Sequence, residues 1–211
     1  MADVGGILDT PNTGGATYYD ETQDKPKVAM PEGVYPAHVI KVDSAVRDVR
    51  GSFKAVIYNV RVKIAPEADD ITFDAVDYDG NEVKVNGGDF TGREIRSNGV
   101  FKFMHPSESD EFESNPGGNK GYSNFCTVLG KQPKTTILEV DGEKVTMKEL
   151  PDLSEDDILG KPVLAVVGKG KPWTSERDGK TRTSLEVKWF RTWADGKDID
   201  PESFEDDDLP F

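Results

Sequence analysis

The chain has 211 residues, with 40 acidic and 26 basic side chains, a net charge of −14 and a pI near 4.6. Hydrophobic residues make up 35% of the sequence, which is enough for one core of about 100 to 150 residues with arms, loops or a tail around it. A single cysteine and two histidines exclude an internal disulfide and a zinc site built from Cys and His. Because there is no apolar run of about 20 residues and no leader-like N-terminus, we expect a soluble protein that is not secreted.

The charge is distributed unevenly along the chain. Residues 198–211 hold seven acids and no base, and residues 1–32 are also acidic. We expect residues 1–32 to form an N-terminal arm, residues 33–197 the folded domain, and residues 198–211 a disordered acidic tail. Within the domain, residues 67–82 hold seven acids and no base, whereas residues 169–191 are mainly basic. The low pI therefore leaves room for a basic surface.

The folded domain begins with the pattern of a β-meander. β-Branched and aromatic residues predict three main strands over residues 34–42, 53–64 and 93–105, with a short strand over 82–85. Turns are predicted at Arg50-Gly51, Asp79-Gly80-Asn81 and Asn86-Gly87-Gly88. The alternation between residues 56 and 64 places Tyr58 in the core.

A helix and two further strands complete the predicted domain. Apolar residues at i, i+3, i+4 and i+7 predict a helix over residues 119–130 that ends at Gly130 and buries Cys126. A small hairpin around Asp141-Gly142 and strands over 162–167 and 180–193 follow, with a turn at Asp178-Gly179. Three main strands, one helix and two strands is the element order of a five-stranded OB-type barrel, whose second and third strands commonly bind oligonucleotides.

The last residues of the chain form the most specific motif. They resemble the acidic tip of bacterial single-stranded DNA-binding proteins, which ends in three aspartates, an aliphatic residue, proline and phenylalanine. Leu209 stands where isoleucine is common. A merely solvated acidic tail has no reason to end in Leu-Pro-Phe, so we interpret the tip as a partner-binding segment made of Asp206, Asp207, Asp208, Leu209, Pro210 and Phe211. Its aspartates also mimic phosphates and can compete with DNA for a basic groove.

A basic and aromatic stretch precedes the tail. Single strands are held by a cationic groove along the backbone and by aromatic faces under the bases. The candidate DNA-binding residues of this stretch are Lys169, Lys171, Trp173, Arg177, Lys180, Arg182, Lys188 and Arg191. Trp173 follows Lys171-Pro172 in a loop, where exposure is expected, whereas Trp189 and Phe190 are expected to be packed because aromatic residues in strands usually are.

The central strands supply a second group of candidates. Phe101 and Phe103 share one face of their strand, where they either pack in the core or stack under bases. Basic residues lie on the same and neighbouring strands. The candidate cations are Arg47, Arg50, Lys54, Arg61, Lys63, Arg93, Arg96 and Lys102.

Beyond the tip, the layout resembles a family of phage-encoded single-stranded DNA-binding proteins with an OB-type barrel. The resemblance lies in "PEGVYPAHVIKVD", "FCTVLGK", "LGKPVLAVV" and the basic strand before the acidic tail. It implies a protein that coats single-stranded DNA in phage replication or recombination, without sequence preference. It also implies a location in the host cytoplasm and recruitment of replication or repair proteins through the tip. Because the sequence has no G-x-x-x-x-G-K-[ST] motif to bind a nucleotide's phosphates, we expect no enzymatic activity and no cofactor.

Two other functions are compatible with the sequence. The first is an acidic adaptor or DNA mimic that uses the same tip and never touches DNA. The second is a metal-dependent nuclease, because such enzymes need converging carboxylates. Its candidates, which we expect to lie together in one solvated loop, are Asp69, Asp70, Asp74, Asp77 and Asp79.

Overall fold

The computed structural model describes residues 28–49, 53–106, 112–115, 118–140 and 142–200. This part of the chain is mainly β, with one α-helix, as the sequence predicts. None of its helices is long and apolar enough to cross a membrane. The strands are β1 (Gly33–Val49), β2 (Phe53–Ile64), β3 (Thr72–Val76), β4 (Glu82–Asn86), β5 (Glu94–Arg96), β6 (Val100–Pro106), β7 (Phe112–Ser114), β8 (Lys134–Val140), β9 (Glu143–Glu149), β10 (Pro162–Lys169), β11 (Trp173–Thr174), β12 (Thr181–Arg182) and β13 (Leu185–Thr192). The helices are α1 (Lys120–Val128) and the 3-10 helices η3 (Pro66–Asp70) and η4 (Gly87–Phe90).

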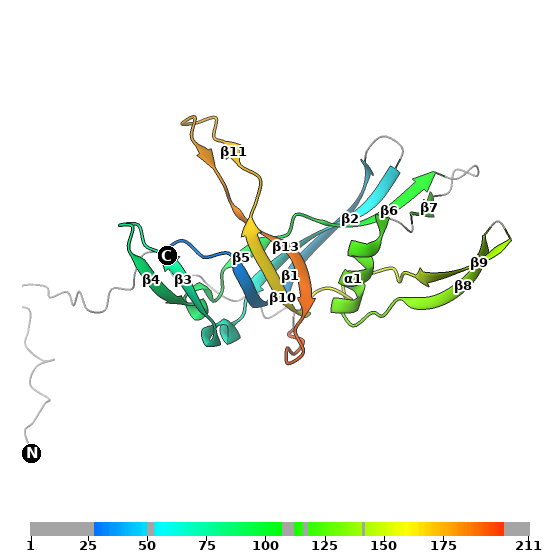
Figure 1. Cartoon of the computed structure of the whole chain (residues 1–211), viewed down its shortest axis with the longest axis horizontal. Helices are drawn as coiled ribbons and strands as arrows, with labels where there is room; N and C mark the ends of the chain where they lie inside the picture. Colours follow the sequence, from blue (N-terminus) through cyan, green and yellow to red (C-terminus); the bar gives the residue numbers. More distant parts are fainter. Residues whose placement is uncertain (1–27, 50–52, 107–111, 116–117, 141, 201–211) are drawn as a thin grey trace, which may run out of the picture.

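One seven-stranded sheet forms the body of the molecule (Figure 1). Its strand order is β13-β10-β1-β2-β6-β7, and β5 pairs with β2 beside β6. All of these ladders are antiparallel. β13, at one end of this order, meets the connection between β5 and β6 at an isolated parallel bridge between Ser97 and Val187, where the Asn98 N–H donates to the Val187 carbonyl at 3.3 Å. No continuous ladder closes the described strands into a barrel. The main sheet has seven strands, two more than the five predicted for the barrel.

The sheet has a buried inner face and an exposed outer face. Along β2, Val60, Val62 and Ile64 are buried and alternate with more exposed residues, because successive side chains of a strand point to opposite faces. Tyr58 is 5% exposed and belongs to the inner face, which confirms its predicted place in the core. The outer face of β1, β2, β5 and β6 therefore carries Asn59, Arg61 and the residues level with them in the ladders.

Helix α1 covers the inner face and one edge of the sheet. Tyr122, Phe125 and Cys126 are buried as predicted, and the Tyr122 ring stacks on Tyr58 with centroids 5.6 Å apart. The helix ends at Gly130, whose φ of 77° suits only glycine, and the Lys131 N–H bonds back to the Cys126 carbonyl at 2.8 Å. The predicted helix is thus confirmed.

Three two-stranded hairpins extend from the body: β3–β4, β8–β9 and β11–β12 (Figure 1). The hairpin predicted at Asp141-Gly142 is β8–β9, and the turn predicted at Asp178-Gly179 joins β11 to β12 with Gly179 at a φ of 64°. The acidic residues expected in one loop are instead divided between η3, β3 and the turn before β4. That prediction was wrong because Ile71, Phe73 and Ala75 give the segment a strand alternation.

Two predicted strands are interrupted. The strand predicted over 93–105 breaks into β5 and β6 at residues 97–99, where Gly99 adopts a φ of 94°. The strand predicted over 180–193 is two elements, because β12 pairs with β11 and only β13 joins the main sheet. The first break leaves both β5 and β6 paired with β2, whereas the second separates the β11–β12 hairpin from the main sheet.

The described residues of the predicted arm, 28–32, and of the predicted tail, 198–200, include several that contact the domain. Before β1, Met30 is buried in the core and Val28 bridges to Asp77. After β13, the Ile199 N–H donates to the Gly160 carbonyl at 3.0 Å, and Lys161 contacts Asp198. The chain entering and leaving the domain is therefore held against it over these few residues.

Candidate functional site

A row of three cations crosses the outer face of the sheet. In the ladders Arg61 of β2 lies opposite both Lys41 of β1 and Arg96 of β5. Like charges opposite each other destabilise a sheet, so this row costs stability unless an anion compensates it. Glu94 accepts from Arg61 Nη1 at 2.8 Å, and Asp43 lies 3.9 Å from Lys41 Nζ, so the compensation within the protein is partial. The row borders a hollow of about 360 Å³ that Asn59 and Ser97 also line.

A stacked aromatic pair lies further along the same face. Phe101 and Phe103 of β6 have ring centroids 5.6 Å apart and planes 13° apart. They lie opposite Ile57 and Ala55 of β2, on the face that carries Arg61. At about 3.3 Å per residue, the four steps along β2 from Ile57 to Arg61 separate the cations from the aromatic pair by about 13 Å. Arg47 of β1 lies opposite Ala55, so it is level with Phe103.

Next to its short ladder with β7, the edge of β6 at Phe103 is held by the residue before the helix. The Phe103 N–H donates to Asn119 Oδ1 at 2.6 Å, and Asn119 Nδ2 donates to the Phe103 carbonyl at 3.0 Å. The Asn119 carboxamide therefore takes the place of a neighbouring strand, and it is 2% exposed. Gly118 approaches the Phe103 ring so closely that an added Cβ would lie 3.2 Å from Cδ2. These contacts fix the position of Phe103.

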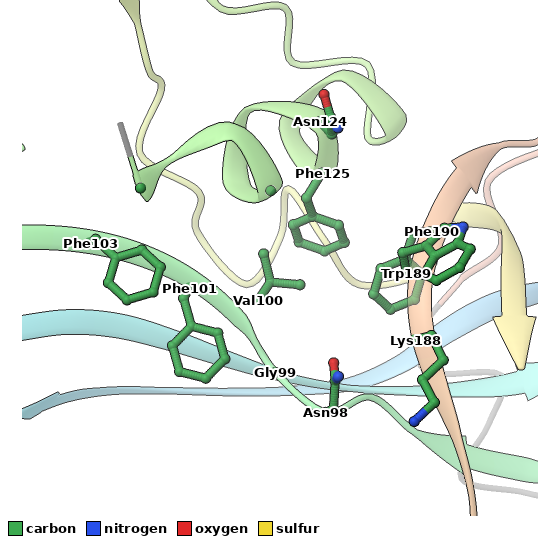
Figure 2. Close-up of a pocket in the computed structure, with 12 residues that line it drawn as sticks. Asn98, Gly99, Val100, Phe101, Phe103, Asn124, Phe125, Lys188, Trp189 and Phe190 are labelled. Atoms are coloured by element: carbon green, nitrogen blue, oxygen red, sulfur yellow. The ribbon is translucent and has the colours of Figure 1, made fainter. Parts of the chain in front are cut away.

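The aromatic pair forms one side of a pocket of about 280 Å³ between β6, α1 and β13 (Figure 2). Figure 2 shows Phe101 and Phe103 side by side, Phe125 of α1 above the centre, and Trp189 and Phe190 of β13 on the far side. Phe190 packs against Phe125 with ring centroids 5.1 Å apart, which confirms its predicted packing. Trp189 is 54% exposed, so the prediction that it is packed was wrong.

A β-bulge explains why Trp189 is exposed. Val187 pairs with Val167 and Trp189 pairs with Val166, so Lys188 is an extra residue in β13. A strict alternation from the buried Val187 would place Trp189 inside, but the bulge shifts the alternation by one residue. As a result Phe190 faces the core and Trp189 faces outward. The sequence carries no sign of the extra residue.

The β11–β12 hairpin carries the second exposed tryptophan. Trp173 is 50% exposed, as predicted, and the Arg182 guanidinium lies 5.8 Å from its ring centroid. Arg182 also contacts the Asp178 carboxylate. Hydrogen bonds from the Ser175 side chain and the Lys180 N–H lower the pKa of Asp178, so this counter-charge is present at neutral pH. Arg182 is thus already engaged by groups of the same hairpin.

The remaining predicted cations are dispersed. Lys102 lies on the inner side of β6, where it contacts Asp152 and the Tyr122 ring, so the structure does not place it with the phenylalanine pair. Lys169 pairs with Glu32 at 3.6 Å and Lys188 with Glu186 at 2.7 Å. Lys54 and Lys63 are partly buried in β2. The exposed cations are Arg47, Arg93, Arg96, Lys171, Arg177, Lys180 and Arg191. Arg50 and the tip Asp206, Asp207, Asp208, Leu209, Pro210 and Phe211 lie outside the described residues.

Two residues of this surface were not predicted as site residues. Lys41 completes the cation row because the register between β1 and β2 places it opposite Arg61. That register includes an irregularity between Val39 and Lys41, so the sequence alone did not align the two residues. Trp189 was assigned to the core because of the hidden bulge.

Buried groups near the pocket are held neutral. Burial raises the pKa of Tyr122, and the neighbouring Tyr58 raises it further. Burial also raises the pKa of the Cys126 thiol, which is fully enclosed by the core as predicted. The Tyr122 hydroxyl donates to the Pro151 carbonyl at 2.8 Å. These residues therefore hold the connection after β9 against α1, and they present no reactive group to the pocket.

The acidic candidates of a nuclease centre are spread over separate elements. Asp77 accepts from Asn81 Nδ2 at 3.0 Å, from the Asn81 N–H at 2.8 Å and from the Asp79 N–H at 2.9 Å, and these bonds, the one from the Asn81 side chain most of all, lower its pKa. Its carboxylate therefore closes the turn before β4. Among residues 28–49, 53–106, 112–115, 118–140 and 142–200, no three His, Cys, Asp or Glu side chains are grouped so that they could hold a metal ion.

Comparisons with protein-family models, with curated proteins and with solved structures gave no match to this chain.

Proposed function

We propose that this protein binds single-stranded DNA without sequence preference, across the outer face of β1, β2, β5 and β6. The observation that carries the proposal is the placement of a stacked phenylalanine pair and a row of three cations on one face. Single-strand binders combine these two features, because cations follow the phosphates and aromatic rings stack under the bases. Exposed Trp189 extends the aromatic surface to β13.

The strand connections support an OB-type arrangement as part of this proposal. In chain order, β1 pairs with β2 and β10, β2 pairs with β5 and β6, and β10 pairs with β13. The parallel bridge between Ser97 and Val187 brings the segment that holds β5 and β6 next to β13. An OB-type barrel binds oligonucleotides on its second and third strands and on the loops at their ends. Here those strands are β2 and β6, and the β11–β12 hairpin corresponds to a binding loop.

The ion pairs on this surface shape the expected binding. Arg61, Lys169, Arg182 and Lys188 each contact a carboxylate, and exposed pairs of this kind are worth about 0 to 1 kcal/mol. A phosphate can replace such a carboxylate at small cost. Neither Arg47 nor Arg96 forms an ion pair with another described residue. Binding should therefore weaken steeply with salt, because each phosphate contact releases counterions.

We further propose that the tip Asp206–Phe211 recruits replication or repair proteins of a phage-infected host and competes with DNA for the cationic surface. The tail from residue 198 onward holds seven acids and no base, and such a segment attracts basic surfaces on this chain and on others. Phe211 can enter an apolar pocket of a partner while the aspartates meet its basic rim. This part of the proposal depends on the sequence alone.

A binding titration tests the proposal. Labelled oligo-dT is titrated with the full chain and with a chain ending at Glu202, by fluorescence anisotropy at low and high salt. We expect both chains to bind at low salt, the shorter one more tightly, with affinity falling as salt rises. If neither chain binds oligo-dT at low salt, the proposal is wrong and the adaptor function is favoured. DNA cleavage in Mg²⁺ or Mn²⁺ would instead favour the nuclease.

A further inference from the structure

The β8–β9 hairpin exposes apolar side chains. It projects from the body beyond α1 (Figure 1) and, within the described chain, forms a sheet of only two strands. Ile137 is 66% exposed and Leu138 is 46% exposed. A two-stranded hairpin of this kind is marginally stable by itself, and an apolar strand edge is a template for pairing with another strand. Its exposed apolar side chains therefore suit a further strand, which the described part of the chain does not supply.

The two edges of the hairpin differ in their surroundings. A groove of about 990 Å³ separates the hairpin from α1, and it is lined by consecutive residues of β9 and its exit, 145–150, but only by Thr136 and Leu138 of β8. The groove thus runs along β9. The backbone edge of β8 is on the side away from α1, where a second strand can reach it.

The two edges also differ in charge. If β9 paired with a second β9 about Thr146, Glu143 would meet Glu149 and Lys144 would meet Lys148, which are repulsive pairs. If β8 paired antiparallel with a second β8 about Ile137, Ile137 would meet Ile137 and Thr135 would meet Glu139. Neither Lys134 nor Glu139 would then face a like charge. Pairing about the centre of each strand is therefore repulsive for β9 and free of like-charge pairs for β8.

We propose that two copies of the chain associate through β8, edge to edge and antiparallel about Ile137, to form a four-stranded sheet. The association is isologous, since the same edge serves both copies, and it goes beyond the proposed DNA binding because the β8–β9 hairpin is separate from the outer face of β1, β2, β5 and β6. A single pair of seven-residue strands is a small interface, so the dimer is reversible and dissociates on dilution.

Charge substitutions at the centre of the interface test this proposal. Ile137→Lys and Ile137→Glu each place two like charges opposite each other in the dimer, while an equal mixture of the two variants pairs opposite charges. Thr146→Lys is the matched control, because Thr146 lies directly opposite Ile137 but on β9. Masses are measured by sedimentation equilibrium of the full chain over a concentration series, and far-ultraviolet circular dichroism verifies that the variants fold.

We expect the wild type and Thr146→Lys to reach twice the monomer mass of 23.2 kDa as concentration rises. Each Ile137 variant should dimerise with a Kd at least about tenfold higher than that of the wild type. The mixture should recover dimer. A wild type that stays monomeric up to about 1 mM overturns the proposal, and so does a dimer that persists in Ile137→Lys. Oligo-dT affinity measured on dilute samples is expected to be unchanged in all variants, so these outcomes are independent of DNA binding.

Discussion

Two aromatic regions of this protein present different surfaces to a ligand. The phenylalanine pair on β6 is fixed by the ladder to β2, by the Asn119 carboxamide and by Gly118, and a cation row lies on the same face. The Trp173 hairpin consists of two two-residue strands, and its arginine is already engaged by the tryptophan ring and Asp178. Preorganised groups give up less entropy on binding. We therefore expect the β6 surface to supply most of the affinity and the hairpin a smaller part.

The largest expected effect is at the phenylalanine pair. Changing Phe101 and Phe103 together to Ala removes stacking worth about 1 to 3 kcal/mol per base, so oligo-dT affinity should fall by at least about tenfold. Tyr78→Ala is the control, because Tyr78 is 76% exposed on the separate β3–β4 turn. Anisotropy titration measures both. A double variant that binds like the wild type would show that the β6 face is not the main surface.

The cation row should determine the salt dependence. Replacing Arg61 and Arg96 by Ala removes up to two phosphate contacts, and each loss should make the slope of log K against log salt less negative by about 0.7. Lys84→Ala on β4 is the control, since its strand belongs to another sheet. The comparison of the two regions fails if the slope is unchanged here and instead changes with Lys171→Ala and Arg177→Ala in the hairpin.

The hairpin should respond weakly, and in opposite directions to two substitutions. Trp173→Ala removes an exposed ring and should lower affinity less than the phenylalanine variant does. Asp178→Asn keeps a side chain that can accept from the Lys180 N–H but frees Arg182 from its counter-charge, so affinity should rise slightly at low salt. Competition titrations at low salt resolve this difference. A decrease for Asp178→Asn would mean that the ion pair is needed to shape the hairpin.

The smallest effect on binding, and a clear effect on stability, is expected at the far end of α1. Lys131 Nζ lies 2.5 Å from Asp157, and its hydrogen bond, with those of Ser154, lowers the pKa of Asp157 from 3.8 to about 2. Because the folded-state pKa is depressed, this stabilisation is present above pH 3.8 and is lost as pH falls toward 2.

Denaturant unfolding at several pH values measures this contribution. Asp157→Asn should lower the free energy of unfolding at pH 7 by about 1 kcal/mol and should differ little from the wild type near pH 2. Oligo-dT affinity at pH 7 should remain close to that of the wild type. An equal destabilisation at both pH values would mean that the charge of Asp157 is not responsible.

Local patterns in the sequence predicted much of the fold. The alternation around Tyr58 and the helical spacing of Tyr122, Phe125 and Cys126 correctly placed the inner face and α1, because each pattern reflects burial of one face. Gly99 gave no comparable warning that β5 and β6 would separate. The bulge at Lys188 was equally hidden, since an extra residue in a strand depends on its partner and not on its own composition.

The candidate site was predicted only in part for a related reason. The phenylalanine pair and the Arg61–Arg96 neighbours follow from residue type and strand face. The ion pairs do not, because Lys102 meets Asp152 and Lys169 meets Glu32 across long stretches of sequence. The basic stretch in the sequence therefore becomes a surface with much of its charge balanced, and the cation row with Lys41 emerges only from the register of three strands.

Ultraviolet crosslinking of oligo-dT to the full chain, followed by peptide mass spectrometry, tests the central claim most directly. We expect crosslinked residues in β6 and β13, with Phe101, Phe103 and Trp189 as the principal sites and a weaker crosslink at Trp173. Crosslinks confined to the β3–β4 or β8–β9 hairpins, or a complex that forms none at β6, would contradict it.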